Sequence, residues 1–273
     1  MKKPFEITDF TADHIEGAVL LSQAAGWAHG YKDWEMLLRL STGRIAICDS
    51  HVVGTGFRMD FGPNLSALNM IIVSENMRSQ GLGRSLMLSL MQSDSDRAYR
   101  LIATRKGRPL YEKLGFEEVD QLVTVRGLLE YVPLPSKAHN FENCDRNGLV
   151  QLESASFGGY RAAVVDWLLA NAKLAVVRDQ GVVQGFAARR LFGQGYVIGP
   201  VVTGNPDHAK ALITHLVQDI KGDLVRLDVT NASELTPWLQ TLGLSIVDAP
   251  PVMQRGVAHL SANRKAVFNQ ALG

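Results

Sequence analysis

The 273-residue sequence predicts an α/β protein with a mixed α+β sheet, organised as two similar domains. Two observations lead to this prediction. Short apolar runs alternate with segments whose apolar residues recur at helical spacing. Several features of the first half also return at near-constant offsets in the second half, which indicates a tandem duplication.

The first half reads in order as a strand, two helices, a hairpin, a strand, a helix, a strand, a helix and final strands. We expect these elements at residues 5–8, 11–25, 36–40, 44–57, 67–73, 81–91, 100–104, 105–114 and 116–126. Residues 26–34 break the helical pattern and are expected to be irregular. Three indole or phenol rings and one imidazole lie within this short segment.

The segment 66–93 says most about function. Residues 67–73 form a nearly unbroken apolar run, and the helix that follows is separated from it by Arg78-Ser-Gln-Gly81-Leu-Gly83-Arg84. Glycines remove side chains that would block a ligand, so backbone N–H groups at a helix N-terminus can face a phosphate. The two arginines add positive charge. The loop is therefore predicted to hold an anionic cofactor.

The sequence pattern of the loop excludes two other kinds of phosphate-binding loop. A nucleotide P-loop needs a Lys-Ser/Thr pair after the glycines, and none follows Gly83. A Rossmann fingerprint needs the spacing G-x-G-x-x-G, which this loop does not have.

Arg78-x-x-Gly81-x-Gly83 after an apolar strand resembles the pyrophosphate loop of the GNAT superfamily of acyl-CoA-dependent N-acyltransferases. About thirty residues later, Leu110-Tyr111-Glu-Lys-Leu-Gly115-Phe116 resembles the helix-to-strand segment near the end of that fold. The order of elements also matches a complete GNAT domain. The resemblance implies a tandem GNAT fold with acetyl-CoA as co-substrate and no metal.

The repeat is visible in single residues. Asp179 lies 130 positions after Asp49, and Leu242 lies 128 positions after Leu114. At the loop position the second half has no glycine pair in residues 205–210, and at the position of Tyr111 it has Leu239. Bulky side chains would crowd a pyrophosphate, so a single acyl-CoA site in the first half is expected.

The domain boundaries follow from these motifs and from two prolines that mark a linker. We expect a catalytic GNAT domain with the acyl-CoA site at 1–130, a linker at 131–147, a degenerate GNAT-like domain at 148–258 and a C-terminal helix at 259–273. The second domain resembles a bacterial class of GNAT-like domains through residues 198–202, 228–231 and, less cleanly, Met253 with Arg255.

The resemblance also implies which residues bind the cofactor. In GNAT enzymes the strand before the loop separates from its neighbour, and its free main chain holds the pantetheine and the thioester carbonyl. The main-chain groups implied here are those of Ile71, Ile72 and Val73. The implied loop contacts are Arg78, Ser79, Gln80, Gly81, Leu82, Gly83, Arg84 and Ser85.

Acyl transfer to an amine needs a neutral amine, an oriented thioester and a proton or hydrogen bond for the leaving thiolate. Tyr111 is the candidate general acid, because a phenol with a pKa of about 10 is protonated at neutral pH. The alternative is an amphipathic core tyrosine. Glu75 is a candidate general base through water, and alternatively it starts the helix electrostatically. An enzyme with no dedicated base is a further option.

Candidates for the acceptor site come from the irregular segment. Trp27, Tyr31 and Trp34 can form apolar walls or cation–π contacts, or alternatively pack a helix against the sheet. His29 and Asp33 are pocket and base candidates, or alternatively solvated or capping residues.

The second half contributes one further candidate. Arg161 at a helix start can pair with a substrate carboxylate, with solvated surface charge as the alternative. His208 and His215 lack a third ligand, so no metal site is predicted.

Bulk properties bound the function. With 46% hydrophobic and 20% charged residues and a net charge of +1, the sequence predicts no nucleic-acid surface. The cysteines Cys48 and Cys144 have no metal spacing, and no apolar stretch has the length of about 18 residues that a membrane span needs. We expect a cytoplasmic protein without membrane partners, with a homodimer left open.

These expectations fit an N-acetyltransferase that moves an acetyl group from acetyl-CoA to the amine of a small molecule, by direct transfer in a ternary complex. No well-placed cysteine suggests a covalent acyl-enzyme. The alternative is a non-catalytic sensor that binds acyl-CoA or a metabolite. Another acceptor or a longer acyl donor also stays open.

Overall fold

The structure is a computed structural model that describes residues 4–91, 97–135, 137–258 and 261–271. The chain forms two compact units, which are described separately. Unit 1 consists of Met1–Leu101, Lys106–Glu117 and Gln254–Gly256, and unit 2 consists of Ile102–Arg105, Glu118–Met253 and Val257–Gly273. No helix within the described ranges is long and apolar enough to cross a membrane.

The sheet of unit 1 has the strand order β1-β2-β3-β4-β5, antiparallel as far as β4 and parallel between β4 and β5. The strands are β1 (Glu6–Asp9), β2 (Thr42–Cys48), β3 (His51–Asp60), β4 (Leu65–Val73) and β5 (Ala98–Ile102). The helical elements are η1 (Ala12–His14), α1 (Ile15–Ala24), α2 (Tyr31–Leu40), η2 (Glu75–Met77), α3 (Leu82–Met91) and α4 (Arg108–Lys113).

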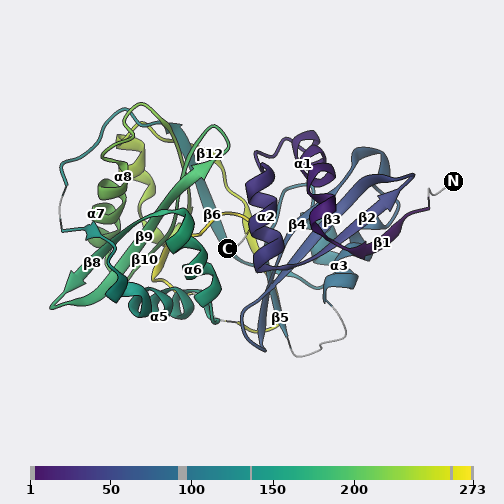
Figure 1. Ribbon diagram of the computed structural model, residues 1–273, viewed down its shortest axis with the longest axis horizontal. Helices are drawn as coiled ribbons and strands as arrows, with labels where there is room; N and C mark the ends of the chain where they lie inside the picture. Colours follow the sequence, from purple (N-terminus) through teal and green to yellow (C-terminus); the bar gives the residue numbers. More distant parts are fainter. Residues whose placement is uncertain (1–3, 92–96, 136, 259–260, 272–273) are drawn as a thin grey trace. The chain divides into compact units, whose positions relative to one another are not determined.

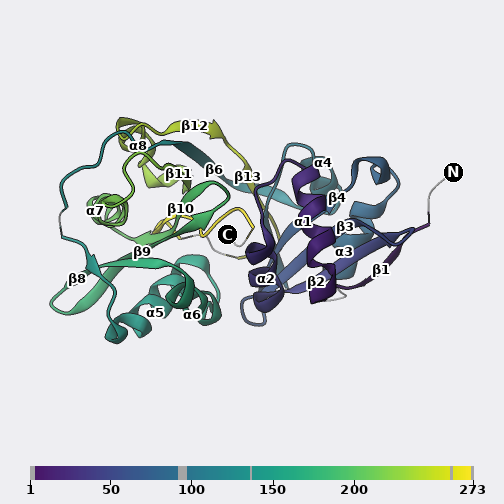
Figure 2. The same cartoon turned by 45° about the horizontal axis from the view of Figure 1, so that its top comes forward.

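Helices cover both faces of this sheet (Figures 1 and 2). Helices α1 and α2 lie on one face, where Phe57 of β3 contacts the ring of Trp34 at 5.7 Å between centroids. Helix α3 lies on the other face, close to β3, because glycine occupies two β3 positions there. A Cβ atom at Gly56 would stand 2.8 Å from Leu90 of α3.

Unit 2 repeats this plan. Its sheet has the order β6-β11-β14-β10-β9-β8-β7, with β12 on the other edge of β6. Helices α5 and α6 lie on one face of the sheet and α7 lies on the other (Figure 2). The core consists of aliphatic side chains from α7, β10 and β11, such as Leu212, Ile198 and Leu227.

The strands of unit 2 are β6 (Glu117–Leu128), β7 (His139–Asn140), β8 (Lys173–Asp179), β9 (Val182–Phe192), β10 (Gly195–Thr203), β11 (Leu224–Thr230), β12 (Ser245–Asp248), β13 (Pro251–Arg255) and β14 (Arg264–Ala266). The last two residues of β13 belong to unit 1, and Glu117 of β6 does as well. The helical elements are η3 (Asn143–Asp145), α5 (Arg146–Phe157), α6 (Ala162–Asn171), α7 (Pro206–Val217), η4 (Asn231–Ser233) and α8 (Thr236–Thr241).

The division into units does not follow the sequence halves. Strand β6 precedes residue 130, but its residues 122–128 pair with β11 and its residues 124–126 also pair with β12, both in unit 2. Gln254 and Arg255 come from the second half and belong to unit 1. The sequence domains 1–130, 131–147 and 148–258 remain proposals.

Two expectations about helices are wrong. Helix α2 begins at Tyr31 rather than near Met36, because Gly30 donates its N–H to the Asp33 carboxylate at 2.9 Å and so caps the helix five residues earlier. Residues 261–271 of the expected C-terminal helix contain strand β14 and no helix. The backbone there pairs with β10 and β11 instead. The rest of that expected helix lies outside the described residues.

Candidate functional site

Strands β4 and β5 separate towards their C-terminal ends. Their pairing covers Leu65, Ser66 and Ala67 of β4, after which β4 continues to Val73 without a partner on that side among the described strands. On its other side β4 stays paired with β3, where Ile72 faces Thr55 and Val73 faces Gly54. One backbone edge of the expected cofactor strand is therefore unpaired.

A β-bulge lies in the separated part of β4. Two residues, Met70 and Ile71, stand opposite the single Gly56 of β3. Met70 has φ of 50°, which a non-glycine residue adopts at a cost. The Thr55 hydroxyl donates to the Met70 carbonyl at 2.9 Å and holds the bulge in place. The bulge fixes the direction in which the last β4 residues point.

The loop after η2 turns sharply into α3. Ser79 has φ of 62° and Gly81 has φ of 91°, and a Cβ atom at Gly81 would meet nothing within 4 Å. Helix α3 begins directly afterwards, and the N–H of Ser85 donates to the Gly81 carbonyl at 3.0 Å. The N–H groups before Ser85 precede the first intrahelical bond, at the positive end of the helix dipole. This arrangement fits the phosphates of an acyl-CoA.

Gly83 brings the second motif to this loop. A Cβ atom at Gly83 would stand 3.1 Å from the Leu110 side chain and 3.6 Å from Val73. Helix α4 therefore packs against the first turn of α3 at the place where glycine leaves room. The two sequence motifs, which are about thirty residues apart in the chain, meet in unit 1.

Tyr111 lies on α4, beside this contact. Its side chain is buried, and its ring lies 6.1 Å from that of Phe116. Within the described residues its hydroxyl has no hydrogen-bond partner, and burial raises the pKa of Tyr111 above that of an ordinary phenol. The group is thus a protonated phenol that is not committed to another contact.

The charged groups of the loop differ in their surroundings. Arg78 forms an exposed ion pair with Glu75 at 3.1 Å, and the Glu75 side chain is 89% exposed. Arg84 is exposed and has no ion pair within the described part of the chain. Arg84 is therefore free to meet a phosphate, whereas Arg78 would have to share its guanidinium with Glu75.

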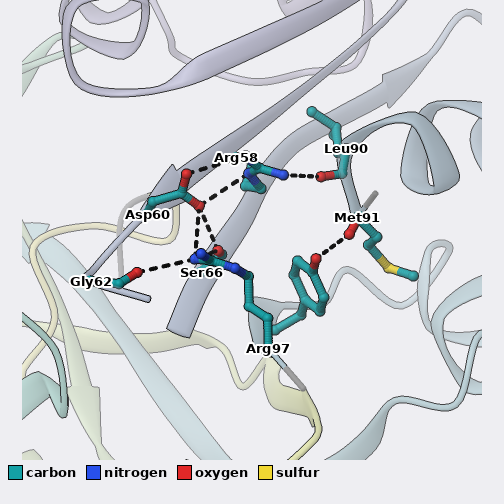
Figure 3. A network of polar contacts seen from close by, with 8 residues as sticks. Arg58, Asp60, Gly62, Ser66, Leu90, Met91 and Arg97 are labelled. Atoms are coloured by element: carbon teal, nitrogen blue, oxygen red, sulfur yellow. Dashed lines mark hydrogen bonds and ion pairs between the residues drawn. The ribbon is translucent and has the colours of Figure 1, made fainter. Parts of the chain in front are cut away.

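A polar network fixes the other end of α3 and the paired end of β4 (Figure 3). Arg58 of β3 donates to the Leu90 carbonyl at 2.9 Å, and its Nε lies 3.0 Å from Asp60. Ser66 donates to Asp60 at 2.6 Å, and Arg97 contacts both Asp60 and Ser66. The strands are clamped where they pair, which leaves the separation at the opposite end of β4.

The expected acceptor residues do not form one cluster. Trp27 and His29 are half-buried, with ring centroids 5.7 Å apart, and Tyr31 is exposed on the first turn of α2. Asp33 caps α2. Trp34 is fully buried and stacks on Phe10 at 5.8 Å. The contacts of Trp34 therefore fit the alternative in which it packs a helix against the sheet.

Asn69 is a candidate that the sequence reasoning missed. It lies in the separated part of β4, its side chain is buried, and neither atom of its amide has a hydrogen-bond partner in the described part of the chain. It stands opposite Phe57, so its side chain is on the α1–α2 face of the sheet. The available signal was one polar residue inside the apolar run 67–73.

Arg161 belongs to unit 2 and is not solvated. Its side chain is fully buried, and its Nε lies 2.7 Å from Glu153. The expected alternative of a surface charge is therefore wrong, because α5 supplies a buried carboxylate.

Among the described residues no group of three potential metal ligands is found.

The counterpart of the separated strands in unit 2 is filled. Strands β10 and β11 pair directly only at Tyr196 and Val197 of β10. Beyond that point β14 lies between them, with Ala266 paired to both Val201 and Val229. Helix α7 is also closed at its N-terminus, because Asn205 accepts from the N–H of Asp207 at 2.8 Å. In the described part of unit 2, β14 thus fills the gap that corresponds to the unpaired edge of β4 in unit 1.

Comparison with known proteins agrees with this geometry. Residues 41–118 and residues 149–269 each match a model described as an acetyltransferase (GNAT) domain, and together they span more than half of the chain. The uncharacterized N-acetyltransferase YitH of Bacillus subtilis (strain 168) is 26% identical over 98% of this chain and 98% of its own length.

Solved structures share the fold. A putative acetyltransferase from Pyrococcus horikoshii superposes with a TM-score of 0.84 at 17% identity, covering 98% of this chain and 96% of its own. A tandem GNAT protein from the clavulanic acid biosynthesis pathway gives a TM-score of 0.66 at 14% identity, covering 94% of this chain and all of its own. The chain is a tandem, two-domain member of the GNAT superfamily of acetyltransferases.

Proposed function

We propose that the protein is an N-acetyltransferase that moves an acetyl group from acetyl-CoA to the amine of a small molecule, directly in a ternary complex. The observation that supports this best is that three features follow one another along the chain. They are the unpaired edge of β4, the open turn at Gly81 and the start of α3. Bound acetyl-CoA would supply the activated thioester. The loop from Arg78 to Ser85 would hold its phosphates, and the main chain of Ile71, Ile72 and Val73 would hold its pantetheine.

The proposed acid is Tyr111. Its phenol keeps its proton at neutral pH because burial raises its pKa, and its hydroxyl is not engaged elsewhere in the described residues. It can therefore donate a hydrogen bond or proton to a leaving thiolate. Glu75, His29 and Asp33 remain proposals for the base, alongside the option of no dedicated base.

We further propose Asn69 as a contact of the acceptor. A buried amide without a partner costs free energy unless a ligand or a water completes its hydrogen bonds. It lies on β4 beside the bulge, two residues before Ile71, which is the first of the proposed pantetheine contacts. Trp27 and Tyr31 stay as proposed acceptor residues. Trp34 and Arg161 are not proposed further, because Trp34 is packed on Phe10 and the buried Arg161 is paired with Glu153.

A non-catalytic acyl-CoA or metabolite sensor is the second candidate function. Arg84, which is exposed and has no ion pair in the described residues, and the open turn at Gly81 would serve such a sensor equally well. The two functions differ in one measurement, which is the release of free CoA in the presence of an amine.

The test starts with calorimetric titration of acetyl-CoA into the wild type and Gly81→Trp. We expect one site per chain that the substitution abolishes, because the indole would fill the open turn. Gly62→Trp is the matched control, since Gly62 has φ of 81° and nothing within 4 Å of its Cβ position. Two sites, or equal loss in both variants, would contradict the proposed loop.

The second step is CoA release with a panel of amino acids, polyamines and amino sugars. Release with at least one amine supports the transferase. Binding of acetyl-CoA without release with any amine of the panel would favour the sensor. No binding at all would remove both functions.

A further inference from the structure

Three buried charged side chains meet in unit 2, on α5, at the start of α6 and on β14. The side chains of Glu153 and Arg161 are fully buried, and that of Arg264 is 6% exposed. One oxygen of Glu153 lies 2.7 Å from Nε of Arg161 and 3.1 Å from Nη2 of Arg264. Two guanidinium groups thus share one carboxylate.

A buried charge is costly unless an opposite charge and hydrogen bonds compensate it. The Phe157 ring lies 4.0 Å from the guanidinium carbon of Arg161 and 5.3 Å from that of Arg264. Cation–π attraction to one ring offsets only part of the cost of burying two cations. The one Glu153 carboxylate contacts both guanidinium groups.

The donors of Arg264 show where such a group would bind. Nη2 donates to the Glu153 carbonyl at 3.3 Å and to the Ser156 hydroxyl at 2.8 Å. Nε and Nη1 are buried and have no hydrogen-bond partner among the residues that the structure describes. Guanidinium donors form their strongest hydrogen bonds with anionic oxygens. These two N–H-bearing atoms are the unsatisfied part of the cluster.

The start of α6 adds positive potential beside Arg161. This ten-residue helix begins at Ala162, and no side chain caps it. Helix N-termini favour negative charge. The preceding residues contain exposed Gly158, with φ of 87°, and Tyr160, which is 69% exposed. Solvent therefore reaches the chain directly next to the buried cluster.

We propose that unit 2 contains a binding site for a small oxyanion, a carboxylate or a phosphate group, which Arg264 and Arg161 form beside Glu153. The anion would accept from Nε and Nη1 of Arg264 and add a negative charge beside this guanidinium group. The site does not depend on acyl transfer, so it can exist whether or not the proposed transferase activity does.

The test is thermal unfolding of the full chain with increasing sodium acetate or sodium phosphate, at fixed pH and with ionic strength held constant by sodium chloride. We expect a saturable rise of the melting temperature with at least one oxyanion. Arg264→Gln should weaken the apparent affinity by about tenfold or more, because it removes the charge and the free donors. A preference for acetate or for phosphate identifies the source of the oxyanion.

Arg189→Gln is the matched control. Arg189 is also buried, but its guanidinium is satisfied by the Leu216 carbonyl and by Asp219. This variant should keep the full oxyanion response even if it is less stable. Any phosphate bound by the loop at Gly81 contributes equally to both variants, so only their difference counts.

Glu153→Gln tests the site in the opposite direction and serves if Arg264→Gln does not fold. Removal of the competing negative charge should tighten oxyanion binding by about tenfold or more. The proposal is overturned if Glu153→Gln responds like the wild type, or if folded Arg264→Gln keeps the wild-type response. It is also overturned if no oxyanion gives a saturable shift.

Discussion

The proposed chemistry depends on one hydroxyl group, that of Tyr111. Tyr111→Phe keeps the ring that packs near Phe116 and removes only the proton donor. We expect turnover to fall by about 100-fold or more, within the range for loss of a general acid, with the Kd for acetyl-CoA unchanged. Steady-state kinetics and calorimetry check this. Tyr131→Phe, at an exposed tyrosine, is the control, and unchanged turnover in Tyr111→Phe would remove Tyr111 from the mechanism.

The raised pKa of Tyr111 makes a separate prediction about pH. Because burial disfavours the phenolate, the phenol stays protonated beyond a pH of about 10, where a free tyrosine is half ionised. Turnover at saturating substrates should therefore not fall between pH values of about 8 and 10 through loss of this proton. A fall in that window that disappears in Tyr111→Phe would show that Tyr111 ionises there.

Substitutions at Asn69 and Thr55 distinguish a proposed ligand-binding residue from a residue whose hydrogen bond lies within the protein. Both are buried on the same face of neighbouring strands. Thr55 donates to Met70, whereas the Asn69 amide has no hydrogen-bond partner within the described ranges. Asn69→Leu should not lower thermal stability and should raise the acceptor KM by about tenfold, the effect of one lost hydrogen bond. Thr55→Val should cost about 1 kcal/mol of stability. Destabilisation by Asn69→Leu with an unchanged KM would assign Asn69 a structural role.

At the scale of elements, the order of strands and helices could be predicted, because the apolar residues that a helix or strand buries recur with the period of that element. The loop 78–84 and the Tyr111 segment could also be predicted, since both are defined by particular residues at a fixed spacing in the sequence. The start of α2 was missed because Asp33 acts through a single capping bond that hydrophobic spacing does not reveal. Strand β14 was missed because its pairing with β10 and β11 is long-range. The partnerless amide of Asn69 is likewise a property of the fold.

Helix α3 has a structural contact at its C-terminal end and the proposed acyl-CoA contact at its N-terminal end. Substitutions of one arginine near each end distinguish the two. Arg58→Met removes the hydrogen bond to Leu90 and the ion pair with Asp60, so the free energy of unfolding should fall by about 2 kcal/mol. Arg84→Met, at an exposed position without an ion pair in the described residues, should leave stability unchanged and weaken acetyl-CoA binding by about tenfold. Urea unfolding and calorimetry measure both. The reverse assignment of effects would contradict the proposed division.

At the scale of the molecule, the two GNAT domains share one fold but differ at the place where unit 1 is proposed to bind acyl-CoA. In unit 1 the end of β4 has a free edge and a helix start that is open. In unit 2 the corresponding gap holds β14, and the start of α7 is capped by Asn205 and followed by the negative charge of Asp207. A tandem chain can therefore use its second domain for something other than acyl-CoA, which makes the buried arginine cluster of unit 2 relevant.

The exchange of strands between sequence halves predicts that the first half cannot fold alone. A chain ending at residue 130 would contain β6 without β11 and β12, so that Leu122 and Val125 would lose the surroundings that bury them. Exposure of such side chains costs about 1.5–3 kcal/mol each. Unit 1 would also lose Gln254, which accepts from the buried Arg100 through two hydrogen bonds of 3.1 Å.

We therefore expect residues 1–130 expressed alone to aggregate, and the same fragment to be soluble when residues 131–273 are produced with it. Size-exclusion chromatography and acetyl-CoA titration of the two samples check this. The cut falls between β6 and β7, outside any helix or strand, so the break itself removes no strand pairing. A monomeric 1–130 fragment with a cooperative unfolding transition and wild-type affinity for acetyl-CoA would contradict the prediction. Such a fragment would show that residues 1–130 fold without the β6 partners β11 and β12, and that the sequence boundary at 130 marks an independent domain after all.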